Sequence, residues 1–260
     1  MTRDAFTVAA LLFDLDNTLF DRDRAVRCWA EAFAHARLAL ADDDAGARAE
    51  AVAYALALDA RGYGAKPPMF AALKARYPAL AASVEDLVDA FYRQVPTYAT
   101  LDGGAQRLLD ALERAGVPFG IVTNGSRYQL HTIQALGLDS RTPCILVSDL
   151  VGCRKPDAAI FAAAAARLGV PPGAVLFVGD NPEADVWGAH RAGMRTAWLQ
   201  RDRGQAWPAT IMERCADLTI GALDELVGLV GRAIGPGRTE LAACRRERRC
   251  GLHGWDTAVR

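Results

Sequence analysis

Residues 8–20, which read VAALLFDLDNTLF, contain the pattern that decides the fold. Six apolar residues, Val8 to Phe13, follow one another without interruption, and the run ends abruptly at Asp14. A short continuous apolar run is typical of a strand that is buried on both faces of a sheet. The segment therefore predicts a central strand that carries a polar cluster, Asp14 to Thr18, at its carboxyl end.

The same pattern returns later in the chain. Helix-like segments that end at glycine separate further apolar runs, and these runs lie at 119–122, 144–147, 174–178, 195–199 and 218–220. Strands that alternate with helices of this length predict an α/β protein. We expect a Rossmann-like, doubly wound parallel sheet.

Between the first two runs, the composition changes. Residues 25–95 are rich in alanine and read as several helices with no strand, with breaks at 42–46, 62–68 and 78–83. We therefore expect a core formed by 1–21 and 98–231, an inserted helical cap at 22–97, and a flexible, arginine-rich tail at 232–260.

Charge and hydropathy exclude several classes of partner. Lys and Arg (30) nearly balance Asp and Glu (31), so the chain has no overall field to hold nucleic acid or an anionic membrane. No stretch has the length of a membrane span, and the first apolar run is too short for a secretory signal. We expect a cytoplasmic protein, either a monomer or a homodimer, with reduced cysteines.

Polar residues follow the expected strands where open α/β sheets bind ligands, at their carboxyl ends. Asp14 and Asp16 follow the first strand, Thr123 follows the second and Asp180 follows the fourth. Two carboxylates so close repel each other unless a cation lies between them or one is protonated. Oxygen ligands favour a hard ion such as Mg²⁺, and Asp185 is a further ligand candidate.

Four motifs in this order resemble those of the haloacid dehalogenase superfamily, in the branch with a helical cap inserted after the first motif. The resemblance covers residues 8–230. The motifs are DLDNTLF at 14–20, TNG at 123–125, KPD at 155–157 and VGDNPEAD at 178–185. Each motif alone can be explained by an ordinary turn or loop, but the occurrence of all four in this order is specific to the superfamily.

The resemblance implies a magnesium-dependent phosphatase that acts on a small phosphate ester. Asp14 is implied to be the nucleophile and Asp16 the general acid and base, with Lys155 neutralising charge. Thr123, Asn124, Gly125 and the positive end of a helix that begins near Ser126 are implied to bind the phosphoryl group, together with Lys155. The implied metal ligands are Asp14, Asp16 through its backbone carbonyl, Asp180 and Asp185.

Alternatives stay open within this resemblance. They are a phosphomutase, a dehalogenase and a non-enzymatic phosphate-binding domain, although dehalogenases of this superfamily lack the second aspartate that Asp16 supplies. The substrate is expected to be a sugar phosphate, phosphoglycolate, a nucleotide or flavin mononucleotide. Among cap residues, Tyr63 is the first candidate for reading the leaving group, whereas Lys66 and Lys74 are expected at the surface.

Overall fold

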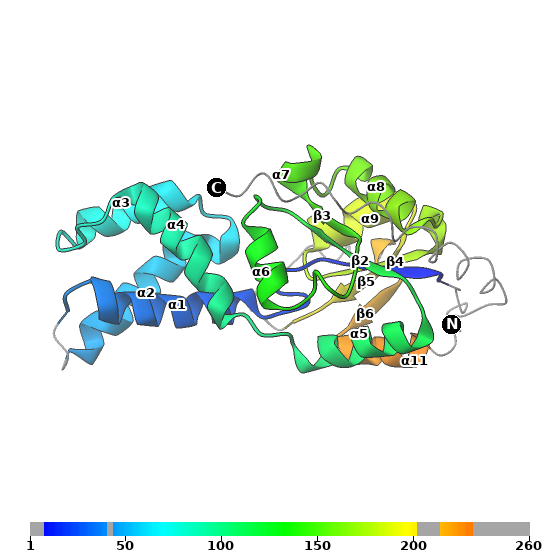
Figure 1. The fold of residues 1–260 in the computed structure, drawn as a ribbon, viewed down its shortest axis with the longest axis horizontal. Helices are drawn as coiled ribbons and strands as arrows, with labels where there is room; N and C mark the ends of the chain where they lie inside the picture. Colours follow the sequence, from blue (N-terminus) through cyan, green and yellow to red (C-terminus); the bar gives the residue numbers. More distant parts are fainter. Residues whose placement is uncertain (1–7, 41–43, 202–213, 231–260) are drawn as a thin grey trace.

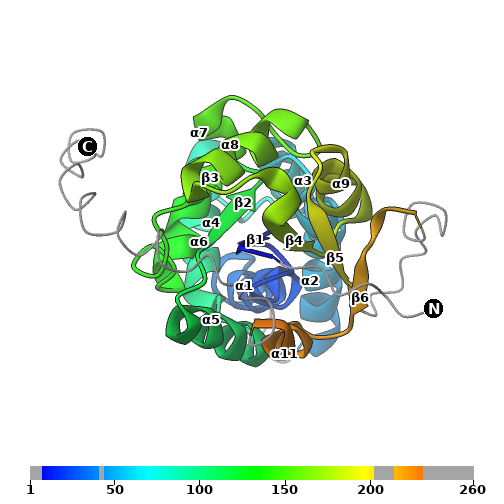
Figure 2. The ribbon, with the colours of Figure 1, turned by 90° about the vertical axis from the view of Figure 1, so that its right-hand side faces the viewer.

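The computed structural model describes residues 8–40, 44–201 and 214–230. Its centre is a six-stranded parallel sheet with the strand order β3-β2-β1-β4-β5-β6, which Figure 2 shows with β1 in the middle. The winding reverses at β1, because β2 and β3 lie on one side of it and β4 to β6 on the other. The strands are β1 (Ala10–Phe13), β2 (Phe119–Thr123), β3 (Ile145–Val147), β4 (Val175–Gly179), β5 (Arg195–Leu199) and β6 (Leu218–Ile220). The prediction of a Rossmann-like, doubly wound parallel sheet is confirmed.

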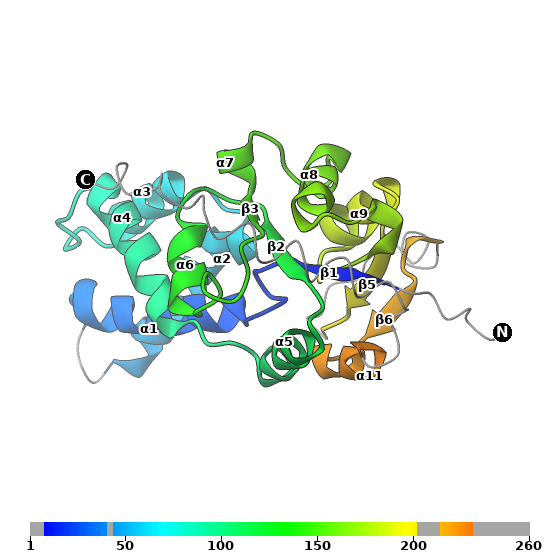
Figure 3. The same cartoon turned by 45° about the vertical axis from the view of Figure 1, so that its right-hand side comes forward.

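Helices cover both faces of the sheet, with α5 and α11 on one face and α8 and α9 on the other (Figure 3). Successive side chains of β1 supply the two faces in turn. Leu11 and Phe13 belong to one buried cluster with Leu108, whereas Leu12 belongs to a second cluster with Phe161. The strand is apolar throughout because neither of its faces meets water. The helices outside the segment 22–98 are α5 (Gly103–Ala115), α6 (Gln129–Ala135), α7 (Ser148–Val151), α8 (Ala158–Leu168), η3 (Pro172–Ala174), η4 (Pro182–Trp187, a π-helix), α9 (Gly188–Arg191), η5 (Leu223–Leu226) and α11 (Val227–Val230).

A helical segment, residues 22–98, lies beyond the carboxyl ends of β1 and β2, on the left of Figure 1. Its elements are α1 (Arg22–Arg37), α2 (Ala45–Asp59), η1 (Ala60–Gly62), α3 (Lys66–Arg76), α4 (Val84–Gln94) and η2 (Val95–Tyr98). Trp29 anchors its interior, with ring centroids 4.9 Å from Phe33, 5.9 Å from Phe70 and 4.7 Å from Phe91. The described part of this segment contains helices and no strand, as its composition predicts.

One helix begins later than the sequence suggests. The prediction of a helix from Ser126 is wrong, because α6 begins at Gln129. Residues 126–131 form tight turns instead: the backbone N–H groups of Gln129, Leu130 and His131 each donate to a carbonyl three residues earlier. The Ser126 hydroxyl accepts from the backbone N–H of Tyr128 at 3.4 Å. The α6 that results is seven residues long.

Two further predictions concern the C-terminal tail and membrane-spanning helices. The predicted tail, 232–260, lies outside the described residues. Among the described residues, no helix has both the length and the apolar character needed to cross a membrane.

Candidate active site

The sheet places Asp14 beside the end of β4. The backbone N–H of Asp14 donates to the carbonyl of Val178 at 2.9 Å, so the residue after β1 keeps its position in the ladder. Asp180 directly follows β4, and η4 then returns Asp185 to the same point. The Asn181 side chain fixes this turn, because its carbonyl oxygen accepts from the N–H groups of Glu183 and Ala184 at 3.0 and 2.9 Å. Three separate elements thus converge at the point where the sheet changes its winding.

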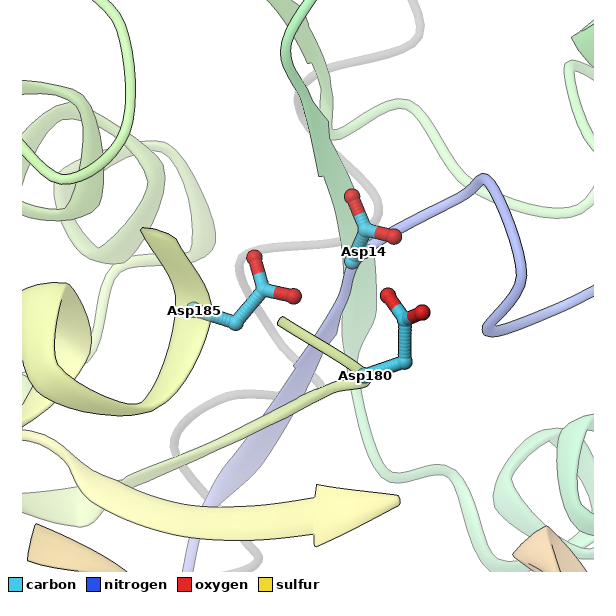
Figure 4. Close-up of side chains that lie close together, drawn as sticks. All are labelled: Asp14, Asp180 and Asp185. Carbon is cyan, nitrogen blue, oxygen red and sulfur yellow. The ribbon is translucent and has the colours of Figure 1, made fainter. Parts of the chain in front are cut away.

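Asp14, Asp180 and Asp185 form an acidic cluster, in which one carboxylate oxygen of each residue lies within 4.8 Å of the others (Figure 4). Gly179 makes the close approach of Asp185 possible, since a Cβ atom there would lie 2.2 Å from Asp185 Oδ2. Three carboxylates so close repel one another, and an all-oxygen set of this kind is what a hard divalent cation binds. The cluster therefore has the donor chemistry of a metal site.

Lys155 supplies a positive charge to this cluster. Its Nζ lies 2.6 Å from Asp14 Oδ1 and 2.8 Å from Asp185 Oδ1, and the residue is only 3% exposed. Burial opposes its charge, but Asp14 and Asp185 outweigh burial, so the pKa of Lys155 is raised above its ordinary value. Burial also raises the pKa of Asp185 to about 6, although Lys155 opposes this rise. Lys155 and Asp185 can therefore both be buried, because their opposite charges compensate each other.

The Asp16 carboxylate lies apart from the acidic cluster. Its Oδ2 accepts from Gln129 Nε2 at 2.9 Å and lies 3.9 Å from Arg22 Nε. Burial raises the pKa of Asp16, while Arg22 acts in the opposite direction. A carboxyl group whose pKa is raised holds its proton more readily, which suits a residue that must donate one. Of the four predicted metal-binding aspartates, the structure thus brings three carboxylates together and turns the fourth elsewhere.

The TNG motif lies at the end of β2, next to these groups. Thr123 is buried, and its hydroxyl accepts from Gln129 Nε2 at 3.0 Å. Asn124 holds the main chain of Lys155 through two hydrogen bonds, one to its carbonyl at 2.8 Å and one from its N–H at 2.9 Å. The Gly125 N–H donates to Ser148 Oγ at 2.9 Å. In this structure Asn124 therefore positions Lys155, and the Gly125 amide, expected to bind a phosphoryl oxygen, is engaged by Ser148.

The helical segment contains a buried ion cluster that the sequence does not predict. The Arg22 guanidinium binds both Asp59 oxygens, at 2.9 and 3.0 Å, and Lys66 Nζ lies 2.7 Å from Asp59 Oδ1. The expected surface position of Lys66 is therefore wrong, since it is 5% exposed. Burial alone would raise the pKa of Asp59, but Arg22 and Lys66 together lower it to about 2. Nothing in the local sequence marks this cluster, because Arg22 and Asp59 lie at opposite ends of two consecutive helices and a loop separates Asp59 from Lys66.

The loop of residues 60–65 joins α2 to α3, and the ion cluster fastens it. The Gly62 N–H donates to Asp59 Oδ2 at 2.9 Å, and Lys66 Nζ donates to the Gly64 carbonyl at 2.7 Å. Gly64 must be glycine, because a Cβ atom there would lie 2.0 Å from the Leu58 carbonyl oxygen. The loop carries Tyr63, whose hydroxyl accepts from the Asn181 side chain, next to Asp180. Half-buried Lys74, by contrast, donates to the Leu80 and Ala82 carbonyls.

Comparison with known proteins agrees with this architecture. A family model for haloacid dehalogenase-like hydrolases matches residues 8–193. The chain is 34% identical to phosphoserine phosphatase from Thermus thermophilus over 54% of this chain and 55% of that one. It is 32% identical to N-acetylmuramic acid 6-phosphate phosphatase from Pseudomonas putida, over 78% and 90%. The crystal structure of YfnB from Bacillus subtilis bound to magnesium superposes with a TM-score of 0.61 at 25% identity, covering 86% and 99%.

The chain belongs to the haloacid dehalogenase-like hydrolase family, because the family model matches well over half of its length. It spans 55 to 62% of the length of the first three curated relatives that it matches.

Proposed function

We propose that the protein is a magnesium-dependent phosphomonoester hydrolase that acts through an aspartyl-phosphate on Asp14. The observation that supports this most directly is the convergence of Asp14, Asp180, Asp185 and Lys155 at one point, with Asp16 two residues beyond Asp14. A nucleophile, a cation site and a fixed positive charge are what the transfer of a phosphoryl dianion to a carboxylate requires.

In the first step, a carboxylate oxygen of Asp14 attacks phosphorus in line with the leaving group. The bond from phosphorus to the ester oxygen breaks, its electron pair goes to that oxygen, and Asp16 gives it a proton. In the second step, Asp16 removes a proton from water, which attacks the phosphoryl group and releases Asp14 and inorganic phosphate. Thr123 and Lys155 hold the phosphoryl oxygens in both steps, which makes each attack effectively intramolecular.

Asp14, Asp180 and Asp185 would hold the metal ion, together with the backbone carbonyl of Asp16. Mg²⁺, when bound, offsets the repulsion between the nucleophile and the phosphate dianion. The all-oxygen donor set fits this ion, and YfnB was crystallised with magnesium bound.

The substrate we propose is a small phosphorylated metabolite. Relatives are named for phosphoserine and for N-acetylmuramic acid 6-phosphate, both of which are small phosphate esters. We further propose that residues 22–97 are a cap that closes over the site and selects the leaving group, since Tyr63 reaches Asn181 beside Asp180. Asn181 and Asp180 lie at the end of β4, in the core.

Among the alternative functions, dehalogenation is the least suited to this site. A halide leaves without a proton, so a dehalogenase has no use for an acid after the nucleophile, whereas Asp16, two residues beyond Asp14 in the chain, has a raised pKa. A phosphomutase would share both aspartates but would return the phosphoryl group to a sugar. A binding module would bind phosphate without turnover.

One assay separates these readings. Purified protein is incubated with 4-nitrophenyl phosphate and a panel of phosphorylated metabolites, first with Mg²⁺ and then with excess EDTA. We expect release of inorganic phosphate that stops in EDTA, returns with Mg²⁺ and disappears in Asp14→Asn. An Asp110→Asn variant, altered in an ion pair with Arg141 that includes no candidate site residue, should keep full activity. Phosphate binding without turnover across the panel would contradict the proposal.

A further inference from the structure

Gln129 bridges two residues of the site that belong to different strands. Its Nε2 donates to Asp16 Oδ2 at 2.9 Å and to Thr123 Oγ1 at 3.0 Å, so one amide group ties the end of β1 to the end of β2. The backbone makes room for this bridge at Gly125, where a Cβ atom would lie 2.8 Å from Gln129 Cγ. The side chain is half-buried and belongs to the first residue of α6.

An amide N–H can only donate, and this fixes which atoms remain for chemistry. Because the Gln129 donor already engages Asp16 Oδ2, this contact favours Oδ1 as the oxygen that carries a transferable proton. Because Thr123 Oγ1 also accepts from Gln129, its own hydrogen points away from the amide and is available to a phosphoryl oxygen. With one hydrogen bond to each group, Gln129 thus determines which oxygen of Asp16 and which side of the Thr123 hydroxyl remain available to a substrate.

We propose that Gln129 is a positioning residue for proton transfer, which holds Asp16 so that Oδ1 faces the ester oxygen of the leaving group. This inference rests on the proposed function. The proton passes from Asp16 Oδ1 to the ester oxygen while that oxygen takes the electron pair of its broken bond to phosphorus and Asp14 forms its own bond to phosphorus. Without the amide, the carboxyl group turns away and the leaving group departs unprotonated.

The test uses leaving groups that differ in their need for a proton. 4-Nitrophenolate leaves readily as an anion, whereas the alkoxide of glycerol phosphate has to be protonated. The ratio kcat/KM covers the steps up to departure of the leaving group, so it isolates the first proton transfer. Positioned acids contribute about 10²- to 10⁴-fold to such steps. We therefore expect Gln129→Met to lower kcat/KM for glycerol phosphate at least roughly tenfold more than for 4-nitrophenyl phosphate.

Gln134→Met is the matched control, because Gln134 is an exposed glutamine on the same helix. It should leave both substrates unaffected. Gln129→Leu, which also lacks the donor, should reproduce the selective loss. An equal loss with both substrates, or no loss in either variant, would overturn the role of Gln129 while the wild-type activity left the proposed function standing. Failure of the wild-type protein to hydrolyse either ester would instead overturn the proposed function itself.

Discussion

Lys155 is the residue on which the charge balance of the site depends. It is enclosed by Asp14 and Asp185, and Asn124 holds its main chain from both sides. An ammonium group between two buried carboxylates is weak evidence for net stability, but the loss of one partner from such an arrangement is costly. The identity of this residue therefore affects stability as well as catalysis.

We expect Lys155→Met to lower the free energy of unfolding by about 3–5 kcal/mol in the absence of metal, because it leaves buried carboxylates uncompensated. Mg²⁺ should recover part of this loss, since a cation at the acidic cluster replaces the missing charge. Urea unfolding with and without Mg²⁺ measures both effects. Arg154→Met, a change at the exposed neighbour, should alter neither. Equal stability of Lys155→Met and wild type in EDTA would show that the contact carries no such energy.

At this scale, the sequence indicates which residues follow strands but not how their side chains turn. Asp14, Thr123 and Asp180 are found where the apolar runs place them, because each lies at the end of a run, Asp180 after one intervening glycine. Gln129 lies six residues beyond Thr123 and 113 residues from Asp16, so no local pattern identifies it. Lys66 was expected at the surface because a charged residue is rarely buried unless it is paired, and its partner Asp59 lies across a loop.

At the scale of elements, the loop between α2 and α3 contains three consecutive residues with positive φ. Ala60 and Arg61 adopt φ values of 47° and 56°, in the left-handed region that side chains disfavour, and Gly62 follows at 93°. The Arg22–Asp59–Lys66 ion cluster holds this strained turn at its base. The same contacts hold the loop that carries Tyr63, through Gly62 and Gly64 on either side of it.

The stabilising effect of this cluster should depend on pH in a defined direction. Arg22 and Lys66 lower the pKa of Asp59 from 3.8 to about 2 in the folded protein. The stabilisation that ionised Asp59 provides is therefore complete above its ordinary pKa, and it is lost as the pH falls towards the pKa of the folded state. Linkage gives a loss of about 1 kcal/mol between pH 5 and pH 3. The difference in unfolding free energy between wild type and Asp59→Asn should therefore shrink over this range.

Urea unfolding at a series of pH values measures that difference. Asp224→Asn provides the comparison, because its ion pair with Arg107 lies at the surface and is screened by water. Its effect on stability should be small at each pH. A constant difference for Asp59→Asn from pH 5 to pH 3 would contradict the linkage argument.

The strands and most helices follow from periodicity and from stop signals. The start of α6 does not, because Ser126 is a favourable cap in isolation but the chain after it makes tight turns before the helix begins. Local preference fixes what a segment can do, and packing against the neighbouring elements selects among the options.

For the molecule as a whole, a few side-chain contacts join the helical segment to the sheet domain. Tyr92 of α4 stacks on Tyr128, which precedes α6, with ring centroids 4.2 Å apart and planes 3° apart. The Tyr128 hydroxyl also donates to Asp89 Oδ1 at 2.9 Å. Together with the contact between Tyr63 and Asn181, these interactions hold the segment against the sheet domain at two places.

We expect Tyr92→Leu to favour a more open arrangement, because a stacked aromatic pair contributes about 0.5–1.5 kcal/mol beyond its buried area. Small-angle scattering should show a larger radius of gyration, and KM should rise several-fold. Tyr54→Leu alters a tyrosine of α2 that stacks against Arg76 within the helical segment, so it should leave both quantities unchanged. Identical scattering curves for Tyr92→Leu and wild type would show that the stack does not control closure.

The position of β1 in the sheet has a consequence for biosynthesis. This strand precedes the other five strands that the structure describes, yet its two hydrogen-bonded neighbours are β2 and β4, which begin at Phe119 and Val175. The carboxylate we assign as nucleophile is therefore made early and placed late, after more than a hundred and sixty further residues have left the ribosome. A nascent chain that ends before β4 has neither Asp180 nor Asp185, so the acidic cluster is complete only after most of the sheet has been translated.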